Sequence, residues 1–288
     1  MHQRLVLRRG RNLQCIAGQT RTRGHSRGGH GHVAGDPVSE GRRCRSETTP
    51  RSVRQTHLAH LRLMSGGKLI VVPTPVGNLS DMTPRGLEVL KEAHAVLAED
   101  TRTTGKLLRH FGVDTPLWAF HQHNEHRALT GVVQQLKGGV TLALCSDAGT
   151  PGISDPGFLL VRACVEADID VECLPGATAF VPALVTSGMP CDRFLFEGFL
   201  PHKKGRQKRL TALLEVPCTV VLYESPHRVA KLLAQLQDLG AGGRTVALCR
   251  EISKLHEETL RGTVDELAVH LESHPPRGEY VVVLGEAV

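Results

Sequence analysis

Short apolar runs alternate with segments of helical period along the chain from Lys68 to Leu284. Apolar residues that recur every three or four positions predict helices, and brief β-branched runs that stop at Gly or Pro predict buried strands. The expected strands cover residues 69–72, 95–98, 140–145, 171–174, 194–199, 218–223, 245–250, 259–262 and 280–284. The expected helices cover residues 84–95, 103–111, 129–136, 156–167, 177–186, 205–214, 226–239 and 264–271. This alternation predicts an α/β fold with largely parallel sheets.

The alternating pattern breaks and restarts at residues 188–191, where a Gly and a Pro fall close together. We therefore expect two α/β domains, an N-terminal one over residues 64–189 and a C-terminal one over residues 190–288. Each domain would be small for an independent hydrophobic core. For that reason we expect the two to share a substantial interface.

Residues 1–63 differ in composition from the rest of the chain. They hold 13 Arg, no Lys, three acidic residues and none of the ten aromatic residues. A segment with so little apolar area cannot offset the entropy lost on folding, so we expect a disordered Arg-rich extension. It could be a basic RNA-binding arm, an organellar transit peptide, or an untranslated stretch before a start at Met64. The last is favoured, and a chain that begins at Met64 should keep the fold and the activity.

The formal net charge of +6 comes from this extension, because residues 64–288 hold 22 basic and 26 acidic residues. The net charge is therefore no sign that the folded part as a whole binds nucleic acid. The eight Cys residues form no C-x-x-C pair, which disfavours a zinc site or a disulfide framework and suits a reducing, cytoplasmic location. No apolar run approaches the roughly 20 residues of a membrane span, so we expect no membrane contact.

Loops rich in Gly, Pro and small polar residues follow several of the expected strands. Ligands of parallel sheets bind outside the carboxyl ends of the strands, and such loops let a ligand approach the backbone closely. The loops cover residues 73–79, 99–102, 146–157, 175–179 and 224–228. The first strand is not followed by G-x-G-x-x-G, and G-x-x-x-x-G-K-[ST] does not occur, which disfavours an NAD site and a P-loop. The sequence predicts a small-ligand site of another kind.

Six segments resemble, in the same order, the ribosomal RNA small subunit methyltransferase I family, a branch of the tetrapyrrole (corrin/porphyrin) methylase superfamily. They are TPVGNL at 74–79, AEDTR at 98–102, SDAGTPGISDPG at 146–157, PGATA at 175–179, EGFLP at 197–201 and YESPHR at 223–228. The resemblance implies S-adenosylmethionine-dependent methylation of the ribose 2′-oxygen of a decoding-region cytidine in small-subunit (16S) ribosomal RNA. It also implies naked RNA or the assembled small subunit as partner, a homodimer, and no metal.

The same resemblance implies that S-adenosylmethionine binds in a cleft between two α/β domains. Carried onto this sequence, the cofactor-binding residues are Pro75, Val76, Gly77, Ala148, Gly149, Thr150, Ile153, Thr178, Ala179 and Glu224, with Ser253 as a further candidate. Thr150 stands where the superfamily members that act on small molecules have Asp. This departure fits the ribosomal RNA branch.

A ribose hydroxyl is a weak nucleophile, so positioning should supply most of the rate gain and a carboxylate or His base should add about 10²–10⁴-fold. The first candidates for the catalytic groups are Glu99 and Asp100, at the carboxyl end of an expected strand. Asp100 could equally cap the helix that follows. Asp147 and Asp155 could each close a turn through their own backbone.

A second group of catalytic candidates, Asn124 and Glu125, lies in the polar segment 121–126 together with three His residues. The segment could be a solvated loop, a contact to the substrate, or a metal site. Residue types alone leave these alternatives open.

Residues 202–209, the basic segment, place five cations within seven positions directly after Pro201. A net-acidic protein that binds a polyanion needs a local basic surface, although a solvated helix face would show the same pattern. The predicted RNA contacts are Lys203, Lys204, Arg206 and Arg209 of this segment, and Arg102 and Arg228 beside the Gly- and Pro-rich loops.

Two other functions remain open. One is S-adenosylmethionine-dependent C-methylation of a tetrapyrrole such as uroporphyrinogen or a precorrin, which Thr150 and the basic segment disfavour. The other is a non-catalytic ligand-binding or scaffold protein that retains the fold, which the intact polar loops disfavour.

Overall fold

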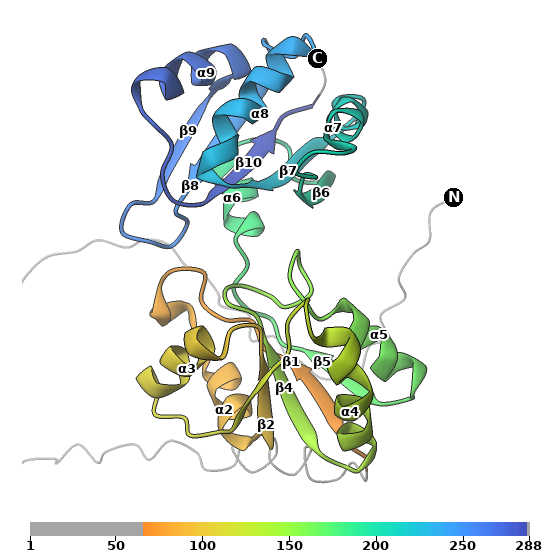
Figure 1. Cartoon of the computed structure of the whole chain (residues 1–288). Coiled ribbons are helices and arrows are strands. Elements are labelled where there is room, and N and C mark those ends of the chain that lie inside the picture. Colours follow the sequence, from red (N-terminus) through yellow and green to blue (C-terminus); the bar gives the residue numbers. More distant parts are fainter. Residues whose placement is uncertain (1–65, 287–288) are drawn as a thin grey trace, which may run out of the picture. The chain divides into compact units, whose positions relative to one another are not determined.

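The computed structural model describes residues 66–286, and the statements below concern that part of the chain. The predictions for residues 1–63 and for a start at Met64 lie outside the described residues. Within them are two five-stranded sheets with helices packed on their faces (Figure 1). The prediction of an α/β fold with two such units is confirmed.

The first sheet is parallel throughout. Its strands are β1 (Lys68–Val71), β2 (Ala95–Ala98), β3 (Leu117–Ala119), β4 (Thr141–Cys145) and β5 (Asp170–Cys173), in the order β3-β2-β4-β1-β5. Every pair runs parallel, so the carboxyl ends of all five strands lie at one edge. The loops that follow the strands are therefore gathered at that edge.

Helices cover both faces of the first sheet. They are the α-helices α2 (Pro84–Glu92), α3 (Thr101–His110), α4 (Glu125–Lys137) and α5 (Phe158–Glu166), and a short 3₁₀ helix, η1 (Leu79–Asp81), precedes α2 without burying a residue. One apolar cluster joins Ile70 and Val96 of the strands to Leu90 of α2 and Leu108 of α3. The other joins neighbouring strand positions to α4 and α5. Adjacent strand residues point to opposite faces, which explains why the central strands β2 and β4 are almost wholly apolar.

The second sheet contains β6 (Phe194–Phe199), β7 (Thr219–Glu224), β8 (Thr245–Arg250), β9 (Glu258–Thr263) and β10 (Tyr280–Leu284), in the order β6-β7-β10-β8-β9. Only the β6–β7 pair is parallel, so the prediction of largely parallel sheets is wrong for this sheet. The physical reason is connectivity. A short loop joins β8 to β9 as an antiparallel pair, and β10 inserts between β7 and β8, antiparallel to both.

The second sheet is also covered on both faces. Helices α7 (Arg206–Leu214), α8 (Pro226–Asp238) and α9 (Val264–Ser273) contribute to one large apolar cluster, and α6 (Phe180–Ser187) packs against the other face. The domain boundary at residues 189 and 190 stays a prediction. Ala183 and Leu184 of helix α6 lie before that boundary in the sequence, yet they pack with strands of the second sheet.

Local sequence signals explain several helix ends. Thr83 accepts a hydrogen bond from the Gly86 amide ahead of Pro84 at the start of α2, and Thr263 with Glu266 forms a capping box on α9. Strand β3 escapes the sequence prediction because three residues carry too little pattern. Helix α4 begins four residues before the predicted position, because its first turn is mostly polar.

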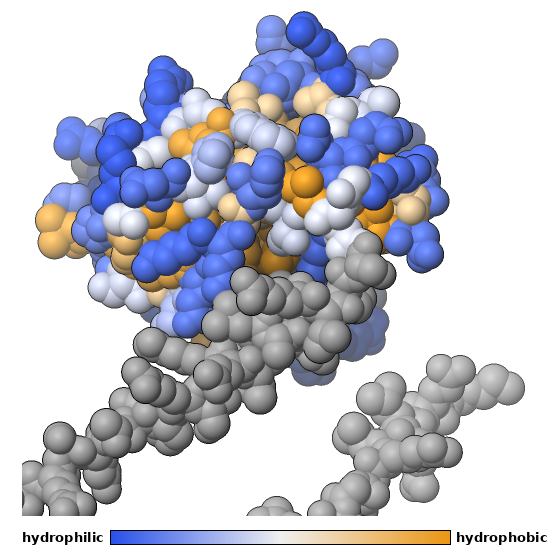
Figure 2. Space-filling model, turned by 90° about the horizontal axis from the view of Figure 1, so that it is seen from below, coloured by the Kyte–Doolittle hydropathy of each residue, from blue (hydrophilic) through white to orange (hydrophobic). Residues whose placement is uncertain are grey.

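The surface of the described residues is mixed in polarity on the face drawn in Figure 2, where apolar residues lie among hydrophilic ones. No helix within residues 66–286 is both long enough and apolar enough to cross a membrane.

Candidate functional site

A cavity of about 440 Å³ opens where the loops at the carboxyl edge of the first sheet meet one edge of the second sheet. That edge of the second sheet holds the ends of β7 and β8 and the start of β10, because Tyr280 pairs with both Glu224 and Arg250. Small-molecule sites are typically hollows of roughly 300–1,000 Å³, so the cavity suits a single organic ligand.

Eight of the ten predicted cofactor-binding residues line this cavity. They are Val76, Ala148, Gly149, Thr150, Ile153, Thr178, Ala179 and Glu224. The other two, Pro75 and Gly77, lie in a second hollow of about 350 Å³ that shares Asp147 with the first. Ser253 lines a third hollow beside Val76 and donates its hydroxyl to Asp81.

The loop after β4 is fixed against the loop after β1 through backbone groups. The Gly149 amide donates to the Thr74 carbonyl at 2.9 Å, and the Thr74 amide donates to the Gly149 carbonyl at 2.9 Å. Gly149 has φ +81°, a left-handed conformation that favours glycine. Thr150 donates its hydroxyl to the Ala177 carbonyl at 3.0 Å, which ties in the loop after β5.

Three acidic side chains from neighbouring loops, the carboxylate cluster Glu99, Asp147 and Asp155, line one side of the cavity. The Asp147 amide donates to Glu99 Oε2 at 3.4 Å. Burial raises the pKa of Glu99 and of Asp147 above their ordinary values. Burial, with the negative charge of Glu99 as the next cause, raises the pKa of Asp155 to about 7. Such shifts in a cavity are typical of groups that handle protons.

The other predicted catalytic residues occupy structural positions. Asp100 caps α3 by accepting the Arg102 amide at 2.8 Å, and its hydrogen bonds with the Arg102 side chain lower its pKa to about 2. Asn124 accepts the His121 amide and donates to the Ala119 carbonyl, which closes the turn before α4. Asp100, Asn124 and Glu125 do not appear among the described residues that line the cavity. For Asp100 the structure therefore shows the cap, one of the two alternatives that the sequence left open.

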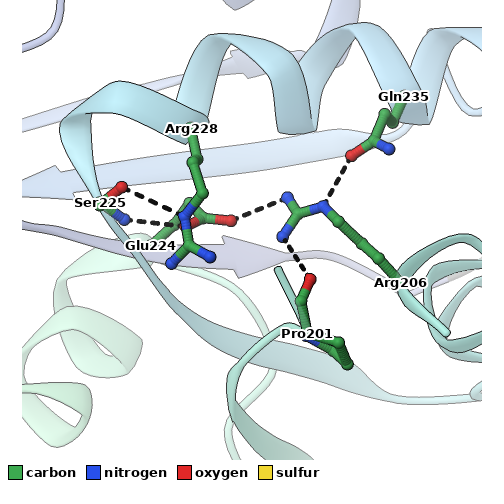
Figure 3. A network of polar contacts seen from close by, with 6 residues as sticks. All are labelled: Pro201, Arg206, Glu224, Ser225, Arg228 and Gln235. Atoms are coloured by element: carbon green, nitrogen blue, oxygen red, sulfur yellow. Dashed lines mark hydrogen bonds and ion pairs between the residues drawn. The ribbon is translucent and has the colours of Figure 1, made fainter. Parts of the chain in front are cut away.

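Glu224 is fully buried at the end of β7 and its charge is paired twice (Figure 3). Arg206 Nη2 lies 2.8 Å from Glu224 Oε2, and Arg228 Nε lies 2.8 Å from Glu224 Oε1. The Ser225 amide donates to the same Oε1 at 2.9 Å. Arg206 also donates to Gln235 Oε1 at 2.9 Å and to the Pro201 carbonyl at 3.5 Å. These contacts form the Glu224 network.

The network revises the prediction for the basic segment. Arg206 is one of the predicted RNA contacts. The residue is instead 4% exposed and paired with Glu224, so its side chain is not available to RNA. Arg209 is exposed and pairs with Glu197. Lys203 and Lys204 are exposed. Arg102 is exposed and paired with Asp100, whereas Arg228 is mostly buried beside Glu224.

Several cavity residues are absent from the predicted site residues. The sequence analysis suggests only a turn for Asp155, and it gives no role to Phe199, Tyr223, Cys249, Ile252, Glu279 or Tyr280. Asp155, Phe199 and Tyr223 do carry a signal, since all three stand inside segments on which the resemblance is based. The residues of β8 and β10 carry none, because an apolar strand looks the same whether or not its end faces a ligand.

The family described as tetrapyrrole (corrin/porphyrin) methylases matches residues 68–268, a span that covers most of the cavity lining. The chain belongs to the tetrapyrrole methylase family. Its curated relatives include proteins named ribosomal RNA small subunit methyltransferase I. That of Pseudomonas aeruginosa is 48% identical over 77% of this chain and 79% of its own length. That of Synechocystis is 46% identical over 77% and 80%, and that of Thermotoga maritima is 43% identical over 76% and 98%.

Solved structures of tetrapyrrole methylase fold support the same architecture. Uroporphyrin-III-C-methyltransferase from Thermus thermophilus matches with a TM-score of 0.55 and 23% identity over 77% of this chain and 96% of its own. Diphthine synthase matches with a TM-score of 0.58 and 13% identity over 76% and 90%. At this level of identity the likeness shows the fold alone.

Proposed function

We propose that the chain is an S-adenosylmethionine-dependent methyltransferase that modifies small-subunit ribosomal RNA, at the ribose 2′-oxygen of a decoding-region cytidine. The observation that carries the proposal is the 43–48% identity to relatives named ribosomal RNA small subunit methyltransferase I, over a span that includes the whole carboxylate cluster. The 2′-oxygen, the cytidine and its place in the RNA come from the resemblance of the motifs.

The residues present fit S-adenosylmethionine. The cavity offers backbone groups at Ala148 and Gly149 and apolar side chains such as Val76, while three carboxylates give it a negative character. A site lined by one sign of charge favours a ligand of the opposite sign, here the positively charged sulfonium. When bound, this cofactor supplies a methyl group on a sulfonium, which leaves as a thioether. A structure of the Thermus thermophilus enzyme is described as a complex with S-adenyl homocysteine, which supports this choice of cofactor.

The chain's own residues would position the hydroxyl and take its proton. As the new O–CH₃ bond forms and the S–CH₃ bond breaks, the ribose O–H loses its proton, and a carboxylate of the cavity can accept it. Asp155 suits this role, because a base works best when its pKa lies near the working pH and burial raises that of Asp155 to about 7. Glu99, which also lines the cavity with a raised pKa, is the second candidate.

Lys203 and Lys204 are proposed as phosphate contacts, since both are exposed in the turn that precedes α7. Arg206 and Arg228 are proposed instead to hold Glu224 in place. The homodimer and the cytoplasmic location implied above stay predictions.

The test is transfer of label from radioactive S-adenosylmethionine. Undermethylated small ribosomal subunits, the naked small-subunit RNA and uroporphyrinogen are offered separately to the full chain. Label in the RNA, mapped to a ribose 2′-oxygen of a cytidine by its resistance to alkaline cleavage, is the expected result. Label in the tetrapyrrole or in neither substrate would contradict the proposal.

A further inference from the structure

Phe199 is an aromatic residue left half uncovered on the wall of the cavity. It ends β6, it is 53% exposed, and it lines the cavity together with Tyr223. The centroids of these two rings lie 5.5 Å apart. One side of the Phe199 ring is thus supported by protein, while about half of its surface remains open.

Aromatic residues are scarce in this chain and concentrated at this place. Five of the ten belong to one series of neighbouring rings, in which Phe180 lies 4.7 Å from Phe196, Phe196 lies 5.1 Å from Tyr223, and Phe180 lies 6.1 Å from Phe194. Phe199 is the member at the cavity with the most exposed ring. Packing against Tyr223 holds its ring in a fixed place.

The backbone is shaped to present Phe199 to the cavity. The register of β6 against β7 shifts between Phe196 and Gly198, and Gly198 has φ +72°. Bulges of this kind turn the next side chain and often lie beside active sites. Leu200 is buried in the core cluster of the second sheet, so Phe199, one position earlier, faces the other way.

The same bulge places Phe199 beside the loop of the carboxylate cluster. A Cβ added to Gly198 would lie 2.5 Å from the hydroxyl oxygen of Ser154, the residue before Asp155. Glycine suits this position, because it has no Cβ to displace the Ser154 side chain and because a φ of +72° favours glycine. Phe199 and the proposed proton acceptor Asp155 thus line the same cavity, with Phe199 on the side of the second sheet.

The loop after Phe199 is anchored at both ends. Leu200 is buried in the core. Arg206, which belongs to the Glu224 network, donates a hydrogen bond to the Pro201 carbonyl (Figure 3). Between these anchors Lys203 and Lys204 are exposed. Lys203 lies four positions after Phe199, a span of at most about 14 Å, so a base at the ring and a phosphate at the lysines can belong to one short stretch of RNA.

We propose that Phe199 is the stacking surface for the base of an unpaired nucleotide of the RNA substrate, with Lys203 and Lys204 on the adjoining backbone. The inference rests on the proposed function. Proteins recognise single-stranded RNA by stacking splayed-out bases on aromatic side chains next to cations. A base held on Phe199 would bring its own ribose, or that of a neighbour, toward the carboxylate cluster.

The experiment replaces Phe199 by Leu, which keeps an apolar side chain without a ring, and by Trp, which keeps an aromatic face. The matched control is Phe194→Leu, because Phe194 is 40% exposed on the same strand and is not among the described cavity-lining residues. Methyl transfer to undermethylated small subunits gives kcat and KM. Calorimetry gives the affinity for S-adenosylmethionine, and sedimentation gives the oligomeric state.

We expect Phe199→Leu to raise the KM for subunits about tenfold or more. Phe199→Trp should stay within about threefold of wild type, and all variants should keep the affinity for S-adenosylmethionine. A wild-type KM in Phe199→Leu would overturn the inference, as would an equal defect in Phe199→Trp. A loss of cofactor affinity would assign the ring to the cofactor instead, and a changed oligomeric state would assign it to an interface between copies. If wild-type protein labels no subunit, the proposed function fails as well.

Discussion

The two sides of the cavity hold their carboxylates in opposite ways. On the side of the second sheet, Glu224 is fully buried and paired with two arginines, so its charge is neutralised by the fold itself. On the side of the first sheet, Glu99, Asp147 and Asp155 lie close together and form no ion pair within residues 66–286. A carboxylate paired in this manner serves structure, whereas unpaired ones with raised pKa values are suited to a cationic ligand and to proton transfer.

The largest effect is expected at Asp155. Asp155→Asn removes the proton acceptor, so kcat for methyl transfer should fall by about 10²–10⁴-fold. Wild-type kcat should rise as the pH passes about 7, because below it Asp155 is protonated and cannot act as a base. Steady-state rates between pH 5.5 and 9 check both. Asp114→Asn, at an exposed position outside the cavity lining, is the control, and an unchanged pH profile in Asp155→Asn would move the role to Glu99.

The same carboxyl should also affect stability. Its pKa is raised on folding, so the stability that it contributes is present at low pH and is lost as the pH rises through about 7. Wild type should therefore lose on the order of 1 kcal/mol relative to Asp155→Asn between pH 5 and pH 8, after allowance for partial exposure. Urea unfolding at the two pH values measures this difference. Equal losses in both proteins would show that Asp155 does not titrate in this range.

The next effect concerns the paired side. Arg206→Met leaves Glu224 with one partner in a buried site, which should lower the free energy of unfolding by about 3–5 kcal/mol. Arg209→Met removes an exposed pair three residues on and should cost less than about 1 kcal/mol. Chemical denaturation of both variants separates the two. If Arg206→Met lost little free energy of unfolding but bound RNA more weakly, Arg206 would be an RNA contact after all.

A smaller effect is expected for the loop after β4, which contains Gly149 and lines the cavity. Gly149→Val should weaken S-adenosylmethionine binding about tenfold or more, because valine is strained at φ +81° on a residue that lines the cavity. Gly139→Val, at φ +90° in open space and outside the cavity lining, should carry a similar strain with wild-type affinity. Calorimetry measures the affinity of both variants for S-adenosylmethionine. Equal affinities would place the loop outside the cofactor site.

The smallest effect should come from the exposed lysines. Replacing Lys203 and Lys204 by Gln should raise the KM for subunits several-fold. It should also reduce the slope of log affinity against log salt by roughly 0.7–0.9 for each phosphate that the variant no longer neutralises. Affinity for S-adenosylmethionine should not change. Binding titrations between 50 and 300 mM salt measure the slope, and a wild-type slope would show that Lys203 and Lys204 are solvated residues without an RNA contact.

The sequence by itself determined the α/β class and the loops that supply the cavity, because apolar periodicity and Gly- or Pro-rich strand ends are local properties of the chain. The family resemblance of the motifs also singled out eight residues that line one cavity. Seven of them follow strands of the parallel first sheet, whose carboxyl ends lie at one edge. Only the tertiary structure decided the direction of the strands in the second sheet, which depends on where β10 inserts. Only the structure separated Arg206 from its neighbours Lys203 and Lys204, because Arg206 starts helix α7 and pairs with a buried carboxylate, whereas the lysines lie exposed in the turn before the helix. The sequence also could not reveal that Asp155 forms no ion pair with the rest of the described chain and has a raised pKa. A pKa is set by burial and by charges that are distant in the sequence, and no motif records those distances.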